Sequence, residues 1–189
     1  MNAIVVGSSS GDAGACAERL REDGMTVVAC EARELEQALE RVDGRLDVLV
    51  TVSDRSIEGS IEDTSESDFR ELLEANLSDV FRVSRACFGA MREHGGGSMI
   101  HIASDAGIRA EHSVAAYSVA CAGVIAVSEL FAAEGAAHGI RANAVCPRPG
   151  ADVAAIVAWL ASEESAHVNG ATIRVDDAAG AAMVVDTRV

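Results

Sequence analysis

Near its amino terminus the chain reads Ala3-Ile4-Val5-Val6-Gly7-Ser8-Ser9-Ser10-Gly11. The four apolar residues are typical of a buried strand, and a helical pattern that closes at Gly24 follows the glycine- and serine-rich turn. A strand, a glycine turn and a helix in this order can hold a diphosphate on backbone N–H groups at the positive end of the helix. A plain strand-to-helix turn fits the same residues, so this stretch alone leaves both interpretations open.

The rest of the chain alternates short apolar runs with helical patterns. The further apolar runs cover residues 25–30, 46–52, 98–103, 140–146 and 171–175, and the further helical patterns cover residues 33–42, 67–91, 113–137 and 152–161. Such alternation predicts parallel strands covered by helices on both faces. We expect a three-layer α/β/α protein with a Rossmann-like, doubly wound parallel sheet of about six strands. No repeat or linker divides the 189 residues, so we expect one domain, 1–189.

Charge and composition exclude several kinds of partner. The net charge is -15, and all 15 basic residues are arginine, so no lysine is present. The acidic field would repel nucleic acids and anionic membranes. The amino terminus has no basic region before its apolar run, and we find no apolar stretch near the 18 residues that span a bilayer. We therefore expect a cytoplasmic protein with neither nucleic acid nor membrane as partner.

Cysteines and histidines are scattered along the chain. The five cysteines form no Cys-x-x-Cys pair and have no histidine at metal-ligand spacing, so we expect reduced thiols that mostly pack in the core, and no metal. The histidines share no spacing either, and we expect them on the surface or in loops. These are His94, His101, His112, His138 and His167.

Several motifs in register point to one known family. They are Ile102-Ala103-Ser104, Tyr117 thirteen residues later, Asn76 in the long middle helix, Ile140-Arg141-Ala142-Asn143-Ala144-Val145-Cys146-Pro147, and Val175-Asp176. Their order and spacing resemble the short-chain dehydrogenase/reductase family over nearly the whole chain. The resemblance implies that Ser104 polarises the substrate oxygen, that Tyr117 exchanges the proton, and that Asn76 supports a water molecule beside a lysine.

The lysine that the family places four residues after the tyrosine is replaced here by Cys121. Residues i and i+4 lie on one face of a helix, so Cys121 takes the catalytic lysine's position. A neutral thiol cannot lower the tyrosine pKa, and an unassisted tyrosine with a pKa of about 10 is ionised to only about one part in a thousand near neutral pH. Arg148 or Arg109 could supply the missing cation. We do not expect Cys121 to act as a nucleophile, because no base is identifiable beside it.

The resemblance also implies a dinucleotide cofactor. Gly7, Ser9, Ser10 and Gly11 form the expected diphosphate turn, and Pro147 falls beside the cofactor in the family pattern. Glu31 ends the second strand, where a carboxylate can accept hydrogen bonds from the adenosine ribose and repel a 2′-phosphate. We therefore expect NAD(H) rather than NADP(H), although Arg33 keeps NADP(H) open.

Three departures from the family pattern predict a cofactor site that is more open than usual. Thr51-Val52-Ser53-Asp54 stands where the family has Asn-Asn-Ala-Gly. Between Glu31 and Asp47 there is room for one helix only, so the strand and helix that border the adenine are missing. After Gly150 the next helix begins almost at once, which leaves no substrate lid. Both ends of the site should be unusually open.

Three functions are compatible with these residues. The first is an NAD(P)-dependent oxidoreductase for a small carbonyl or secondary alcohol. The second is a non-catalytic homologue that forms a homodimer, a homotetramer or a heteromer with an active relative through its two long helices. The third is a non-redox enzyme on the same scaffold, which the retained glycine turn and Glu31 disfavour. We favour the oxidoreductase, with the partner role close behind it.

Overall fold

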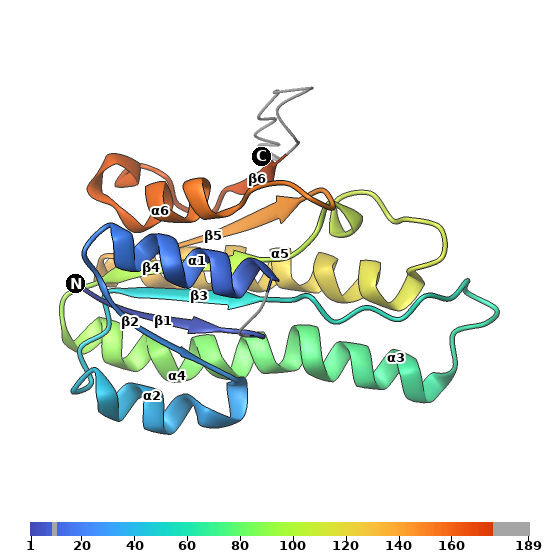
Figure 1. Ribbon diagram of the computed structural model, residues 1–189, viewed down its shortest axis with the longest axis horizontal. Coiled ribbons are helices and arrows are strands. Elements are labelled where there is room, and N and C mark those ends of the chain that lie inside the picture. The colour runs from blue at the N-terminus through green and yellow to red at the C-terminus, as the bar shows by residue number, and fades with distance from the viewer. Residues whose placement is uncertain (9–10, 176–189) are drawn as a thin grey trace.

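The computed structural model describes residues 1–8 and 11–175, and its centre is a parallel sheet (Figure 1). The six strands are ordered β2-β1-β3-β4-β5-β6. Their bounds are β1 Asn2–Val6, β2 Thr26–Cys30, β3 Val48–Val52, β4 Gly97–Ile102, β5 Ile140–Pro147 and β6 Thr172–Val175. The chain runs outward from β1 in both directions, so the switch point of the sheet lies between β1 and β3. The predicted doubly wound sheet of about six strands is confirmed.

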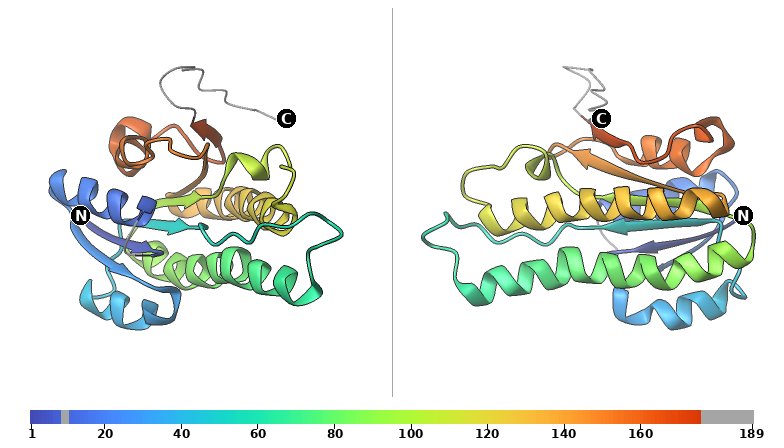
Figure 2. Two further views of the ribbon diagram at one scale, coloured as in Figure 1. Left: turned by 45° about the vertical axis from the view of Figure 1, so that its right-hand side comes forward. Right: turned by 180° about the vertical axis from the view of Figure 1, so that it is seen from behind.

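Helices cover both faces of the sheet. On one face lie α1 (Gly11–Glu22) and α6 (Ala154–Ala161), and on the other lie α2 (Leu35–Arg41), α4 (Asp79–Glu93) and α5 (Ala115–Gly135). Seen from behind, α4 and α5 run side by side across the sheet (Figure 2). A sheet buried on both faces needs nearly continuous apolar strands, which is why the apolar runs located all six strands within two residues at each end.

Small side chains let the helices approach closely. A Cβ added to Gly123 of α5 would lie 2.7 Å from Leu77 Cδ2, so this glycine allows α5 to touch the segment before α4. The core is otherwise made of valine, isoleucine, leucine and alanine with few aromatic rings, as the composition predicted. Trp159 packs against the core on the α1 and α6 face.

The long middle helix is not uniform. Residues 67–91 were predicted as one helix, but α3 (Glu66–Leu73) and α4 are joined by one wide π-helical turn, Glu74–Ser78. Asn76 lies in this turn and is only 1% exposed. The turn and α3 extend past the carboxyl ends of the strands, beside the loop that leaves β3 (Figure 1).

Two expectations from the sequence are wrong. Within the described residues, one segment, Ala115–His138, is long and apolar enough to cross a membrane by length and composition. It consists of α5 and the turn after it, and it packs against the sheet with Ala120, Val124 and Ala132 buried, so the apolar residues on its inner face belong to the core. His101 was expected in a loop or on the surface. It lies in β4, fully buried, with Nε2 2.9 Å from Ser84 Oγ, and burial lowers its pKa to about 4.

Candidate active site

The predicted catalytic hydroxyls meet at the carboxyl ends of the strands. Ser104 follows β4, Tyr117 lies in the first turn of α5, and Pro147 ends β5. Parallel strands bring all their carboxyl ends to one edge, where the loops can carry a site. A cavity of about 250 Å³ opens here, and we call it the tyrosine cavity. Its lining includes Asp12, Val52, Ser53, Asp54, Ser104, Tyr117, Pro147 and Arg148.

The hydroxyl of Tyr117 is held by a hydrogen bond to the backbone. It donates to the backbone carbonyl of Ser53 at 2.8 Å, and the Ser104 side chain lies near enough to it to lower the phenol pKa. The Ser104 oxygen itself accepts the backbone N–H of Ala106 at 3.2 Å. Ser104 therefore has its proton available for the phenol oxygen, and the phenol directs its own proton to the peptide carbonyl.

This environment keeps the phenol protonated. Burial raises the pKa of Tyr117 well above its ordinary value, with smaller contributions from Cys121 and from the charge of Asp54, while Ser104 opposes the shift. A protonated phenol can donate a proton but cannot accept one. Tyr117 is thus set up as an acid.

Cys121 offers no positive charge to offset the burial of the phenol. Its thiol is fully buried, and burial raises its pKa to about 11, so it stays neutral near pH 7. Of the two arginines considered as substitutes, Arg148 lines the tyrosine cavity, whereas Arg109 is exposed and is not part of that lining. Arg148 is the one basic side chain that lines the cavity within the described part of the chain.

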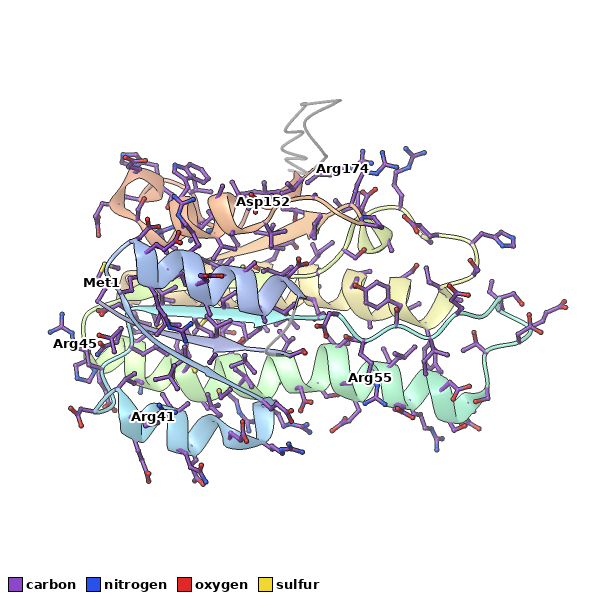
Figure 3. The ribbon with its side chains drawn as sticks, viewed as in Figure 1. Met1, Arg41, Arg45, Arg55, Asp152 and Arg174 are labelled. Atoms are coloured by element: carbon purple, nitrogen blue, oxygen red, sulfur yellow. The ribbon has the colours of Figure 1, made fainter. Side chains whose placement is uncertain are left out.

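Asn76 is engaged differently from the family pattern. Its side-chain oxygen accepts the N–H of Arg55 at 3.2 Å, and its amide donates to the carbonyls of Arg55 at 2.7 Å and Leu72 at 3.1 Å. The backbone carbonyl of Asn76 accepts the Ser53 hydroxyl at 2.9 Å. Arg55 lies on the α3 side of the sheet, where its side chain pairs with Glu71 (Figure 3). Asn76 and Ser53 therefore fasten the loop after β3 to the wide helical turn.

A buried ion pair holds the loop that carries Ser104. Asp105 follows Ser104 and is buried, and both of its carboxylate oxygens lie 2.8 Å from the guanidinium of Arg174 in β6. Arg174 and Asp152 lie together on the β6 side of the sheet, opposite Arg55 (Figure 3). Arg174 Nη2 donates a hydrogen bond to Asp105 Oδ2, and the contact between Nε and Oδ1 adds charge attraction, so this pair helps to hold the loop that carries Ser104.

A second cavity of about 270 Å³ lies at the same edge of the sheet, and we call it the glutamate cavity. Gly7, Glu31, Arg33, Val52, Asp54 and Asn76 are among its lining residues. Val52 and Asp54 line both cavities, so the two meet at the end of β3. A Cβ on Gly7 would lie 3.0 Å from Ala13 Cβ and 3.1 Å from Val52 Cβ, so glycine is what allows β1, α1 and β3 to meet here. Glu31 and Arg33 form an ion pair of 2.8 Å.

Three of the predicted cofactor residues line the two adjoining cavities. Gly7 and Glu31 line one and Pro147 lines the other, while Gly11 begins α1 with a positive φ of 66°. Ser9, Ser10 and Asp176 lie outside the described residues.

Sequence reasoning missed three residues of the site. Ser53 has no distinctive motif, and its two hydrogen bonds depend on the fold. Asp12 stands in the first turn of α1, where an acidic residue is an ordinary helix-start signal. Asp54 was noted only as a departure from the family pattern. Asp54 stands where the family pattern has glycine, and this gain of charge was the signal that could have found it.

Comparison with known proteins agrees with this geometry. The sequence profile of the short chain dehydrogenase family matches residues 32–151, which is more than half of the chain. A carboxyl-CoA reductase of Mycobacterium tuberculosis, which acts on a hydroxy-methyl-oxo-hexahydroindene, is 33% identical over 163 residues, covering 70% of this chain and 62% of that protein. An uncharacterized oxidoreductase of Thermotoga maritima is 33% identical over 120 residues, covering 64% of this chain and 48% of that protein. This chain therefore spans less than two thirds of either relative.

Other relatives match over more of their length. The 3-oxoacyl-[acyl-carrier-protein] reductase of Escherichia coli is 28% identical over 184 residues, covering 81% of this chain and 75% of that protein. The crystal structure of an acetoin dehydrogenase from Salmonella typhimurium superposes with a TM-score of 0.84 at 22% identity, covering 92% of this chain and 93% of that one, which shows the shared fold. The family profile, the relatives and the Ser104–Tyr117 pair agree, and the chain belongs to the short-chain dehydrogenase/reductase family.

Proposed function

We propose that this protein is an NAD(P)-dependent oxidoreductase that reduces a small carbonyl compound to an alcohol. The observation that carries the proposal is the pair of Ser104 and Tyr117 side chains that line the tyrosine cavity together, with the phenol donating its hydrogen bond to the Ser53 carbonyl. The chain 1–189 would act as a single domain in the cytoplasm, with a small-molecule substrate as its partner.

The residues present fit a dinucleotide at its adenosine end. The glycine at position 7 keeps the end of β1 free of a side chain, and the glutamate cavity beside it has room for an adenosine. Glu31 would hold the ribose hydroxyls and disfavour a 2′-phosphate, although its partner Arg33 reduces that preference. We therefore propose NAD(H) over NADP(H). When bound, the dinucleotide supplies a hydride for the carbonyl carbon.

The hydroxyls of Ser104 and Tyr117 would have different roles at the substrate oxygen. Ser104 donates a hydrogen bond that polarises the carbonyl, and Tyr117 turns its proton from the Ser53 carbonyl to the substrate oxygen as that oxygen gains negative charge. The carbonyl carbon gains a hydride with its two electrons, the oxygen gains the phenol proton, and water returns a proton to Tyr117. Ser53 and Asn76 are positioning residues, since they hold the loop that faces the phenol.

The raised pKa of Tyr117 favours one direction of reaction. Reduction starts from the protonated phenol, which is the form present at every ordinary pH. Alcohol oxidation needs the phenolate as a base, and burial without a neighbouring cation makes the phenolate scarce. The lysine of the family is what makes both directions accessible, and Cys121 cannot replace it.

The test is a calorimetric titration with NADH and NADPH, followed by assays of NADH consumption with a set of small ketones and aldehydes. We expect NADH to bind and at least one carbonyl to be reduced at a rate that is flat between pH 6 and 9. Tyr117→Phe should lower that rate by about 100-fold or more while NADH affinity stays the same. Failure of both dinucleotides to bind would contradict the proposal.

A second candidate, a role as an oligomer or heteromer partner, is supported by exposed apolar residues on the outer face of the paired helices. Val119 and Leu130 of α5 are 50% and 45% exposed, and Phe81 of α4 is 36% exposed. A cavity of about 790 Å³, to which Val119 and the 86% exposed Ile61 contribute, adjoins this face. Light scattering of the purified protein should give the mass of a dimer or tetramer, and Val119→Glu should lower it. A monomer that binds no related chain would contradict this candidate.

A further inference from the structure

The tyrosine cavity has two carboxylates in its lining. Asp12 lies half-buried in the first turn of α1, and Asp54 follows β3 and is exposed. They reach the cavity from two different elements, and Ser104 and Tyr117 complete its wall. Arg148 is the one basic residue in this lining among the residues described, so the aspartates outnumber it.

These carboxylates are close enough to influence one another and the phenol. Burial raises the pKa of Asp12, and the charges of Asp54 and Asp152 raise it further. The charge of Asp54 also contributes to the raised pKa of Tyr117. Since like charges repel, a positive group in the cavity would relieve this repulsion.

The proposed reaction creates such a positive group at this place. Hydride must pass to a carbonyl carbon whose oxygen is held by Tyr117 and Ser104, so the nicotinamide ring has to occupy the tyrosine cavity. The ring is neutral in the reduced dinucleotide and positively charged in the oxidised one. The family's lysine would put a like charge near that ring, whereas this chain has a neutral thiol and two carboxylates.

We propose that Asp12 and Asp54 stabilise the oxidised nicotinamide ring relative to the reduced ring, and so set the chain's preference between NAD⁺ and NADH. The inference rests on the proposed function. This stabilisation and the protonated phenol both favour carbonyl reduction. The phenol already carries the proton that reduction needs, and the carboxylates stabilise the positive charge that develops on the ring. The same carboxylates weaken binding of the diphosphate, which both forms of the dinucleotide share.

The experiment is calorimetric titration of the full chain with NAD⁺, NADH and ADP-ribose. The variants are Asp12→Asn and Asp54→Asn, which remove one charge with almost no change of shape. Asp43→Asn is the matched control, because Asp43 is an exposed aspartate at the opposite edge of the sheet, just before β3. ADP-ribose lacks the nicotinamide ring, so its affinity reports the effect on the rest of the dinucleotide, including the diphosphate.

We expect each of the two variants to shift the ratio of NAD⁺ to NADH affinity toward NADH by about three- to tenfold, a typical range for one partly exposed charge. ADP-ribose affinity should rise in the same variants, and Asp43→Asn should change neither quantity. If NAD⁺ and NADH bind but the ratio moves by less than about twofold in both variants, the inference is overturned and the proposed function stands. If none of the three ligands binds the wild-type chain, the proposed function fails as well. Because Asp54 lies in an exposed loop, its variant tests the inference even if Asp12→Asn disturbs α1.

Discussion

The glutamate cavity and the tyrosine cavity have similar volumes, about 270 and 250 Å³, and share Val52 and Asp54, but their charges are arranged in opposite ways. In the glutamate cavity the carboxylate of Glu31, which follows β2, is paired with Arg33. In the tyrosine cavity the charge of Asp54 adds to the raised pKa of Asp12, and the phenol has a neutral thiol where the family has an ammonium group. Under the proposed function, the glutamate cavity keeps the residues expected to recognise the dinucleotide, while the charges around the phenol differ from the family pattern.

The largest effect, on the Tyr117 pKa and the rate of alcohol oxidation, should come from restoring the positive charge with Cys121→Lys. An ammonium within about 4–6 Å typically shifts a pKa by 1–3 units, so we expect the Tyr117 pKa to fall by that amount and alcohol oxidation to rise by roughly tenfold to a thousandfold near pH 8. Tyr117 is the only tyrosine in the chain, so the absorbance of tyrosinate during a pH titration measures its pKa directly. Cys121→Ser is the neutral control. Equal tyrosine pKa values in the two variants would mean that the contrast between the cavities does not depend on this charge.

A substitution confined to the glutamate cavity should weaken dinucleotide binding and leave the pKa of Tyr117 unchanged. Gly7→Val places methyl groups where even a Cβ would lie 3.0 Å from Ala13 Cβ. Overpacking of this kind costs about 1–3 kcal/mol, so NADH and ADP-ribose affinities should fall by roughly tenfold to a hundredfold. Gly89→Val in α4, where a Cβ meets nothing within 4 Å, controls for the substitution itself. If ADP-ribose affinity were unchanged, the glutamate cavity would not be the adenosine site.

A smaller change should follow from removing the charge of Glu31. In Glu31→Gln, Arg33 loses its carboxylate partner and the repulsion of a 2′-phosphate disappears. We expect NADPH affinity relative to NADH to rise by about three- to tenfold, less at high salt because both side chains are exposed. Glu36→Gln on the exposed side of α2 should have no effect. An unchanged ratio would show that charge does not determine dinucleotide choice in this cavity.

The smallest effect, on thermal stability rather than on NADH affinity, is expected from a substitution where the two cavities meet. Ser53→Ala removes the hydrogen bond to the Asn76 carbonyl but keeps the Ser53 backbone carbonyl that accepts the phenol proton. The loss of one buried hydrogen bond costs about 1 kcal/mol, which corresponds to roughly 2–4 °C in melting temperature for a chain of this size. NADH affinity should stay within about twofold of the wild type. Ser56→Ala, an exposed position in the same loop, is the control for thermal unfolding.

Most of the fold was predictable because its apolar pattern is simple. Strands buried on both faces appear as short continuous apolar runs, and glycines mark the turns between them. The wide turn at Glu74–Ser78 was missed because one extra residue in a helix hardly changes the spacing of its apolar residues. His101 was misplaced because a histidine in a strand gives no sign of burial until Ser84 and Phe131 are brought next to it.

The candidate site was predictable only where it repeats a known motif. Ser104 and Tyr117 were identified by spacing, and the structure brings them together. The hydrogen bond from Tyr117 to the Ser53 carbonyl involves a backbone atom 64 residues away, so no side-chain pattern could reveal it. The ion pair of Asp105 and Arg174 likewise joins residues 69 positions apart.

The short connection from the end of β5 at Pro147 to the start of α6 at Ala154 has a consequence for the timing of turnover. In many enzymes a closing lid makes product release the slow step and hides the chemical step from steady-state measurement. Here the segment beside the tyrosine cavity has only six residues between strand and helix, and Arg148, Pro149 and Gly150 within it are exposed. In the proposed reaction, substrate and product would exchange without a large movement of this segment, so we expect the chemical step to set the rate of turnover.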